Sequence, residues 1–405
     1  MRVLVLDSIH GGREIARFLG EGGHQVEVID VYRGDPAVNA ATADHGDYDL
    51  LVAPVHLDPS NVLLRNLKVP AISHHQAVRW ILGKYPVSPF VEITGARGKT
   101  TTACALASLM KGRGVLHSTG GTTLYPEKSV TGKKSITPAS LIEPAIRASR
   151  EKSWMIGEVS LGFSGAGDLG ILTSPEDYVF AGGWKHALRE KLRSAMQMRE
   201  LVLAPGVPAL PGAHMADSLA SAQGETCRYH YGDIRGSFEN PLLHTGAYRV
   251  PLMLAAAAAM LLDIDPAPLG RFAPLGGRLS VRKTGDSRVV DNSNSGACAQ
   301  TAIDAAEYAR KITGTEALVL VIGQAEHAVC EGFPASEVGR AVDFVRPAAL
   351  VLVGKDYNDP AGFSGYVREN PEVPVRHADT LQEAETLACT LVPGAGVVLS
   401  VKTWR

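Results

Sequence analysis

Apolar residues occur in short continuous runs that alternate with amphipathic stretches along nearly the whole chain. The first three runs lie at residues 2–7, 24–32 and 48–55. Near-continuous Val, Leu and Ile runs are typical of parallel strands that helices cover on both faces. Residues 11–23, between the first two runs, have the spacing of a helix. Residues 1–87 are therefore predicted to form a small α/β domain, followed by the proline-containing linker "GKYPVSP".

Two further units continue the alternation. Residues 88–272 contain four expected strands, "FVEIT", "SWMIGEVS", "LGILTS" and "LVLAP", and expected helices at 182–200 and 247–264. Residues 273–405 contain the strand candidates "ALVLVIG", "ALVLVGKD" and "GVVLSVKTW". The sequence shows no repeat of solenoid period. The prediction is three α/β domains in series, at 1–87, 88–272 and 273–405.

Composition excludes several classes of protein. Among 405 residues, 45% are hydrophobic and the formal net charge is -2, with no long Lys/Arg run of the kind that binds nucleic acid. The five cysteines are scattered and form no CxxC pair, which argues against a disulfide framework or a structural zinc site and for a reducing cytoplasm. The longest apolar run, "VPLMLAAAAAMLLDI", is too short to span a membrane, and the first residues do not resemble a signal peptide.

The segment "FVEITGARGKTTT" has the order strand, glycine-containing loop, helix. Such a loop points backbone N–H groups at an anion, and the helix N-terminus adds a partial positive charge. The lysine and the threonine after it suit nucleotide phosphates and Mg²⁺. A Walker A loop would need glycine at Ile93, so the spacing here is shorter, and a tight turn with a solvated lysine is the alternative. The expected ATP-binding residues are Gly95, Ala96, Arg97, Gly98, Lys99, Thr100 and Thr101.

This shorter loop resembles that of the Mur ligase family, which includes folylpolyglutamate synthase and cyanophycin synthetase. The resemblance implies a Rossmann-like N-terminal domain, a central P-loop-type ATPase domain and a C-terminal Rossmann-like domain. In "EVSLG", Glu158 resembles the family's acidic Mg²⁺ position. In "REKLRSA", Lys191 resembles a lysine that is carbamylated and becomes an anionic metal ligand. Thr100, Glu158 and Lys191 are thus the expected metal ligands, and a surface glutamate and an exposed helix lysine are the alternatives.

One position departs from the family pattern. Tyr178 stands where the family often has a histidine, which leaves the ligands of a second metal ion open, with His186 as a candidate. In the third unit, "GGRLSV" and "VVDNSNSG" resemble the family's arginine turn and its aspartate loop, which close over the nucleotide. Arg278 and Asp291 are the matching residues. The family usually has Lys or His inside the second motif, and this chain has Asn and Ser there, a composition that also makes an ordinary polar turn.

The resemblance implies one chemistry. A substrate carboxylate attacks the γ-phosphate of MgATP, and a nucleophile then displaces phosphate from the acyl phosphate. The protein contributes positioning and charge neutralisation. The catalytic residues implied are Lys99, Glu158, Lys191 and Arg278. A P-loop ATPase or switch without ligation is a different class, and the missing glycine at position 93 counts against it.

The stretches "IHGG" and "DVYRGDP" near the start resemble a divergent branch of the family whose substrate is a nickel tetrapyrrole bearing several carboxylates. This resemblance implies that a propionate is activated and that a ring carbon attacks it, so that a carbocyclic ring closes through a C–C bond. The nickel belongs to the substrate, and the sequence shows no ligand spacing for it. An amide-forming ligase that joins a carboxylate to an amine is the alternative, and the oligomeric state stays open.

Candidate substrate contacts surround the first helix. A helix N-terminus beside His10 and Arg13 suits a carboxylate, although two glycines also simply allow entry into a helix. The helix in "AISHHQAVRW" offers further cations or an ordinary linker with exposed polar residues, and the threonine of "SITPAS" offers a substrate loop or a helix cap. The expected substrate residues are His10, Gly11, Gly12, Arg13, Arg33, His74, His75 and Thr137.

Overall fold

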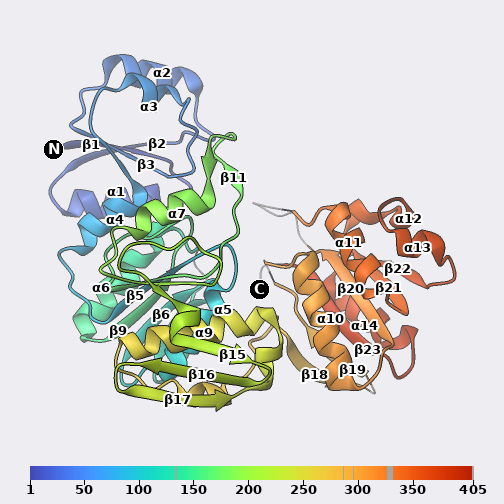
Figure 1. Cartoon of the computed structure of the whole chain (residues 1–405). Coiled ribbons are helices and arrows are strands. Elements are labelled where there is room, and N and C mark those ends of the chain that lie inside the picture. Colours follow the sequence, from blue (N-terminus) through green and yellow to red (C-terminus); the bar gives the residue numbers. More distant parts are fainter. Residues whose placement is uncertain (133–134, 286, 295, 326–331, 404–405) are drawn as a thin grey trace. The chain divides into compact units, whose positions relative to one another are not determined.

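Figure 1 shows a computed structural model that describes residues 1–132, 135–285, 287–294, 296–325 and 332–403. The chain divides into two compact units. Unit 1 comprises Met1–Asn240 and Val250–Arg271, and unit 2 comprises Pro241–Arg249 and Phe272–Arg405. Strands and helices alternate through both units and the large sheets are mainly parallel, which confirms the predicted α/β class. The division into three domains remains a prediction.

The first sheet of unit 1 is parallel and has the order β2-β1-β3-β4. Its strands are β1 (Arg2–Leu6), β2 (Gln25–Ile29), β3 (Leu50–Ala53) and β4 (Ala71–Ser73). Helices α1 (Gly12–Glu21) and α4 (His74–Leu82) cover one face, and α2 (Pro36–His45) and α3 (Val62–Asn66) cover the other (Figure 1). The three apolar runs of the sequence form β1, β2 and β3. Strand β1 is buried on both faces, as its continuous apolar run predicts.

The second sheet of unit 1 has the order β14-β13-β10-β5-β9-β6-β7-β8. The β6–β7 and β7–β8 pairs are antiparallel, and the other described pairs of this sheet are parallel. The strands are β5 (Phe90–Thr94), β6 (Gly114–Ser118), β7 (Gly121–Tyr125), β8 (Ser129–Thr131), β9 (Trp154–Glu158), β10 (Leu169–Leu172), β13 (Glu200–Leu203) and β14 (His214–Met215). The expected strands "FVEIT", "SWMIGEVS", "LGILTS" and "LVLAP" correspond to β5, β9, β10 and β13. Strand β5 is central and wholly buried, so the loop that follows it starts from a rigid position.

Unit 1 contains further helices along the chain from β5 onwards. They are α5 (Lys99–Leu109), η1 (Pro138–Leu141), α6 (Ile142–Glu151), α7 (Ala187–Ala195), α8 (Ala216–Leu219) and η3 (Ala267–Arg271), with α9 (Gly246–Leu261) beginning in unit 2. The alanine-rich part of α9 is completely buried, which explains the long apolar run of the sequence. No helix within the described ranges has the length and apolar character that crossing a membrane requires.

Some elements of unit 1 differ from the sequence expectation. The helix expected at 182–200 is shorter, because Gly182 and Gly183 adopt φ values of 67° and 92° that a helix excludes. They lie in a hairpin of β11 (Val179–Phe180) and β12 (Lys185–His186). A three-stranded antiparallel sheet was also not foreseen, formed by β15 (Ala220–Gln223), β16 (Thr226–Tyr231) and β17 (Ile234–Glu239).

Unit 2 contains a six-stranded sheet of order β18-β19-β23-β20-β21-β22. Its strands are β18 (Ser280–Thr284), β19 (Ser287–Asp291), β20 (Leu318–Gln324), β21 (Ala349–Val353), β22 (Val375–Ala378) and β23 (Gly396–Lys402). Its helices are η2 (Pro241–His244), α10 (Ala299–Thr313), α11 (Ala335–Val345), η4 (Lys355–Tyr357), α12 (Pro360–Phe363), α13 (Gly365–Glu369) and α14 (Leu381–Leu391). The three expected apolar strands form β20, β21 and β23, although residue 404 of the last lies outside the described residues.

Candidate nucleotide and substrate sites

The loop between β5 and α5 requires its two glycines. Gly95 has a φ of 149°, and a Cβ atom there would lie 2.1 Å from Thr173 Oγ1. Gly98 has a φ of 82° and immediately precedes α5. Both positions are therefore closed to residues with a side chain. The narrow loop leads into a helix N-terminus, whose N–H groups attract an anion, so the residues present fit a nucleotide phosphate.

The end of β10 holds this loop in place. The N–H groups of Ala96 and Arg97 donate to Ser174 Oγ at 2.9 and 3.3 Å. Thr173 Oγ1 donates to the carbonyl oxygen of Arg97 at 2.5 Å. These two N–H groups of the loop are thus directed at Ser174. A phosphate would instead face the first turn of α5. Neither Thr173 nor Ser174 was predicted from the sequence, although both stand at the end of the expected strand "LGILTS".

A polar chain joins the predicted Mg²⁺ ligands. Thr100 Oγ1 lies 3.1 Å from Thr119 Oγ1, and the N–H of Thr119 donates to Glu158 Oε1 at 3.4 Å. Glu158 ends β9 and is fully buried. Lys99 Nζ lies over the loop and donates to the carbonyl oxygen of Gly95 at 2.9 Å. A hydroxyl and a carboxylate are the oxygen ligands that Mg²⁺ prefers, so this group fits the ion. Thr119 was not foreseen.

Lys191 is buried, with 1% of its surface exposed. The alternative of an exposed helix lysine is therefore wrong. Its Nζ lies 5.0 Å from the centroid of the Tyr178 ring. A tyrosine at this position thus meets the lysine with its aromatic face. His186 is instead half-exposed and shares a 2.7 Å hydrogen bond with Asp177 Oδ2.

Unit 2 brings the predicted arginine turn and aspartate loop together. Asn294 Nδ2 donates to the carbonyl oxygen of Gly277 at 2.8 Å, directly before Arg278. The hydroxyl of Tyr248 donates to the carbonyl oxygen of Arg278 and fixes the turn from its other side. The two motifs are therefore held as one surface of unit 2. Within "VVDNSNSG", Ser295 lies outside the described residues.

Asp291 is almost completely buried at the end of β19. Its Oδ2 lies 3.2 Å from Arg282 Nη1, and Arg282 Nη2 lies 2.6 Å from Glu385 Oε2. The Asp291 carboxylate thus anchors its own loop through an ion pair with β18. Its expected contact with a nucleotide remains a prediction.

The glycines before α1 bring two predicted substrate segments together. Gly11 has a φ of 97°, and a Cβ atom there would lie 2.5 Å from Ala139 Cβ and 3.3 Å from Thr137 Oγ1. A Cβ atom on Gly12 would lie 1.7 Å from the carbonyl oxygen of Asp7. The loop at the edge of the first sheet therefore packs against η1 of the second. Gly11, Gly12 and Thr137 therefore lie in one region with His10, and their contact with a substrate stays a prediction.

The two predicted arginines are exposed. Arg13 lies in the first turn of α1, and Arg33 follows β2. The backbone N–H of Arg33 donates to Asp30 Oδ1 at 2.9 Å, and Ser8 Oγ donates to Asp30 Oδ2 at 2.8 Å. The Asp30 carboxylate therefore fixes the turn after β2. The arginine side chains extend into solvent at the carboxyl edge of the first sheet, where ligands bind in open α/β folds.

His74 and His75 differ from both interpretations of their helix, because they are buried. His74 Nε2 lies 3.0 Å from the carbonyl oxygen of Leu6, and His75 Nε2 lies 2.9 Å from that of Ser160. Burial lowers the pKa of each ring to about 4, so both are neutral donors to carbonyl groups at neutral pH. His74 belongs to the core and does not present a cation to a carboxylate. His75 links α4 to the segment that follows Glu158.

These buried rings predict a stability that depends on pH. Because the unfolded rings bind a proton near pH 6.5 and the folded ones only near pH 4, the unfolded state gains protons first as pH falls. Each histidine then removes up to about 3 kcal/mol of stability between these two pH values. His75→Gln retains a donor for Ser160 but does not titrate, so it should flatten the pH dependence of urea unfolding. An unchanged slope in that variant would contradict the buried neutral ring, and the exposed His377→Gln serves as the control.

Comparisons with known proteins identify the chain's relatives. Residues 281–403 match the family model described as "Coenzyme F430 synthetase CfbE, C-terminal domain". The whole chain is similar to coenzyme F(430) synthetase of Methanosarcina acetivorans, with 30% identity over 465 aligned positions and 96% of each protein covered.

Solved structures of low sequence identity share the fold. A pseudomurein peptide ligase type C from Methanothermus fervidus is 14% identical, with a TM-score of 0.55 over 100% of this chain and 97% of that one. MurF ligase from Thermotoga maritima, in complex with ADP, is 13% identical, with a TM-score of 0.56 over 93% and 91% of the two chains. These likenesses confirm the predicted Mur-ligase-like fold.

Proposed function

Because the chain belongs to the coenzyme F430 synthetase family within the Mur ligases, we propose that it closes the carbocyclic ring of coenzyme F430. The family makes it an ATP-dependent ligase. The substrate in this proposal is nickel seco-F-430, a tetrapyrrole that brings its own nickel. The observation that carries the proposal is the 30% identity to a coenzyme F(430) synthetase across 96% of the chain.

The chemistry follows from the weakness of a carboxylate as an electrophile. A propionate oxygen attacks the γ-phosphorus of ATP, ADP leaves, and an acyl phosphate forms. A ring carbon that loses its proton then attacks the acyl carbon, forms the new C–C bond and expels phosphate. The product is lighter than the substrate by one water. The protein's part is to hold the reacting groups together and to exclude water from the acyl phosphate.

Three residues of unit 1 support a role in phosphate activation. Lys99 lies over the loop, where its ammonium can neutralise the charge that develops on the phosphates. Thr100 and Glu158 are joined through Thr119 and would hold Mg²⁺, which when bound offsets phosphate charge. The T. maritima MurF ligase of similar fold is in complex with ADP, which supports nucleotide binding by this chain.

Other assignments extend this proposal. A carbamate on Lys191 would supply a further anionic metal ligand, and burial of the side chain supports a role beyond surface charge. Arg278 and Asp291 remain predicted nucleotide contacts of unit 2, supported by the hydrogen bond that holds their two loops together. Arg13 and Arg33 supply cations for the carboxylates of the substrate.

The proposal predicts a product of defined mass. Anaerobic incubation of the purified protein with MgATP and nickel seco-F-430 should yield a compound lighter by one water, with one ADP and one phosphate per product. Absorbance spectra and mass analysis measure the product, and a coupled assay measures ADP. ADP formation only after an amine is added would instead support an amide-forming ligase. Absence of substrate-stimulated ATP turnover with either would overturn the ring-closure proposal.

A further inference from the structure

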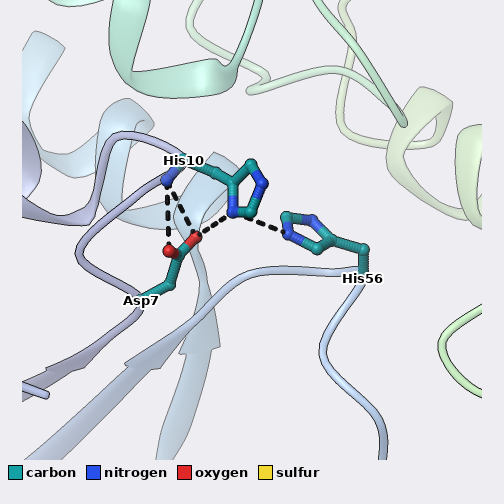
Figure 2. Close-up of side chains that lie close together, drawn as sticks. All are labelled: Asp7, His10 and His56. Atoms are coloured by element: carbon teal, nitrogen blue, oxygen red, sulfur yellow. Dashed lines mark hydrogen bonds and ion pairs between the residues drawn. The ribbon is translucent and has the colours of Figure 1, made fainter. Parts of the chain in front are cut away.

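Three side chains that can bind a metal ion meet at the carboxyl edge of the first sheet. Asp7 follows β1, His56 follows β3, and His10 lies in the turn that leads into α1. Strands β1 and β3 are parallel neighbours, with Val5 opposite Val52, so their carboxyl ends share one edge. Figure 2 shows the His10 ring between the Asp7 carboxylate and the His56 ring. Open α/β sheets bind their ligands at this edge.

The spacing of these side chains fits a coordination sphere. His10 Nδ1 lies 2.9 Å from Asp7 Oδ2 and 3.3 Å from His56 Nε2. One ligand atom from each of the three residues lies within 4.8 Å of the others. Metal bonds of about 2.0–2.2 Å in tetrahedral or octahedral geometry place neighbouring ligand atoms roughly 3–3.5 Å apart. Two of the three separations are thus already close to those of a bound ion.

The Asp7 carboxylate also accepts from the backbone N–H groups of Ile9 and His10, but hydrogen bonds between the three side chains satisfy the two rings poorly. His10 Nδ1 carries at most one proton but faces two partners, Asp7 Oδ2 and His56 Nε2. If the proton points to Asp7, His56 Nε2 receives only a bifurcated contact. If His56 Nε2 instead donates to His10 Nδ1, then His10 Nδ1 and Asp7 Oδ2 are both acceptors and face each other without a proton between them. A cation at the common point would accept electron pairs from all three atoms at once.

We propose that Asp7, His10 and His56 form a binding site for a divalent late transition-metal ion such as Ni²⁺, Co²⁺ or Zn²⁺. Imidazole nitrogens favour these ions, whereas Mg²⁺ and Ca²⁺ favour sites built from oxygen atoms. Three protein ligands leave further coordination positions for water or a carboxylate. The nickel of a tetrapyrrole is a different case, because its ring nitrogens fill the equatorial positions and leave one axial position per face. Three converging side chains therefore fit a free ion.

The surroundings orient these ligands. The N–H of Ile9 donates to Asp7 Oδ1 at 2.7 Å, which turns the other oxygen towards His10. The ring of Tyr32 stacks on His56, with centroids 5.6 Å apart and planes 15° from parallel. Such contacts fix the orientation of ligands before a metal arrives. Lys185 Nζ donates to the carbonyl oxygen of Val55, the residue before His56.

The test uses metal ions alone and no tetrapyrrole. Tag-free full-length protein is stripped with a chelator and titrated with Co²⁺, whose visible absorption reports coordination by imidazole and carboxylate, and then with Ni²⁺ and Zn²⁺ by calorimetry. We expect one ion per chain. His10→Ala and His56→Ala should each weaken binding by at least about 10-fold. His377→Ala removes an exposed histidine of unit 2 and should leave the affinity unchanged.

The outcomes are distinct. Equal affinity in the wild-type protein, His10→Ala and His56→Ala, or binding that His377→Ala also weakens, would overturn the proposal. So would the absence of a stoichiometric ion. Thermal unfolding of each metal-free variant shows whether a loss of binding reflects a loss of the fold, and only folded variants are compared. Ring closure plays no part in these measurements, so failure of the metal site and failure of the proposed reaction are told apart.

Discussion

Lys99→Ala is expected to abolish product formation while leaving the fold intact. The side chain lies over the phosphate loop, and its Nζ bonds to the carbonyl oxygen of Gly95. A cation that stabilises the charge of a phosphoryl-transfer transition state is typically worth about 10³- to 10⁵-fold in rate. Both ADP formation and ring-closed product should fall together, because the acyl phosphate can no longer form. The measurement is the rate of each under saturating MgATP.

A matched lysine supplies the control for this prediction. Lys111 is exposed shortly after α5 ends, and its backbone oxygen accepts a hydrogen bond from Trp154 Nε1. Lys111→Ala should therefore turn over like the wild-type protein. Unfolding midpoints of both variants should match that of the wild type. Normal turnover in a folded Lys99→Ala variant would refute the assignment of the phosphate loop.

Replacing Lys191 is expected to have the second-largest effect. Lys191→Gln removes the amine that would react with CO₂, a reaction that forms an N–C bond and releases a proton. If the resulting carbamate is a metal ligand, its loss should lower the rate by about 100-fold and raise the Mg²⁺ concentration needed for activity. Carbon-13 NMR of wild-type protein in labelled bicarbonate should show one carbamate signal, which Lys191→Gln should lack.

The neighbouring Lys185 tests which lysine matters. It is half-buried, and its Nζ donates to the carbonyl oxygen of Val55 at 2.6 Å. Lys185→Gln should retain the carbamate signal and most of the activity. A signal that disappears with Lys185, or persists in Lys191→Gln, would show that the resemblance placed the carbamate on the wrong residue.

The sequence predicts the parallel sheets well because their strands are buried on both faces. Continuous apolar runs such as 2–7 and 317–323 leave few other structures open. Short strands at the edges of the fold cannot be predicted in this way. Strands β11 and β12 have two residues each, too few to show a period. The β16 segment did carry a signal, since Cys227 and Tyr229 are buried while Arg228 and His230 are exposed, an alternation of period two.

The candidate sites show a similar division. Two glycines and a lysine at fixed spacing mark the predicted phosphate loop, and the backbone conformation at Gly95 and Gly98 disfavours other residues there. The fold alone brings Thr119 and Ser174 beside this loop and His56 beside Asp7 and His10. No local sequence pattern distinguishes these three residues. Adjacent histidines were also misjudged at positions 74 and 75. A helix turns about 100° per residue, yet both rings are buried because α4 packs between the first sheet and η1.

The hydrogen bond from His75 to Ser160 limits how freely substrate recognition can be exchanged between ligases. One hydrophobic core includes residues of α4, η1 and β9, so the first and second sheets of unit 1 share buried surface as well as this bond. A chimaera that took residues 1–87 from a relative would inherit a foreign side chain opposite Ser160. Recombination at the linker between Leu82 and Phe90 would therefore cut through a packed interface. New specificities in such an enzyme are more accessible through substitutions in the loops at the sheet edge than through transfer of the whole N-terminal segment.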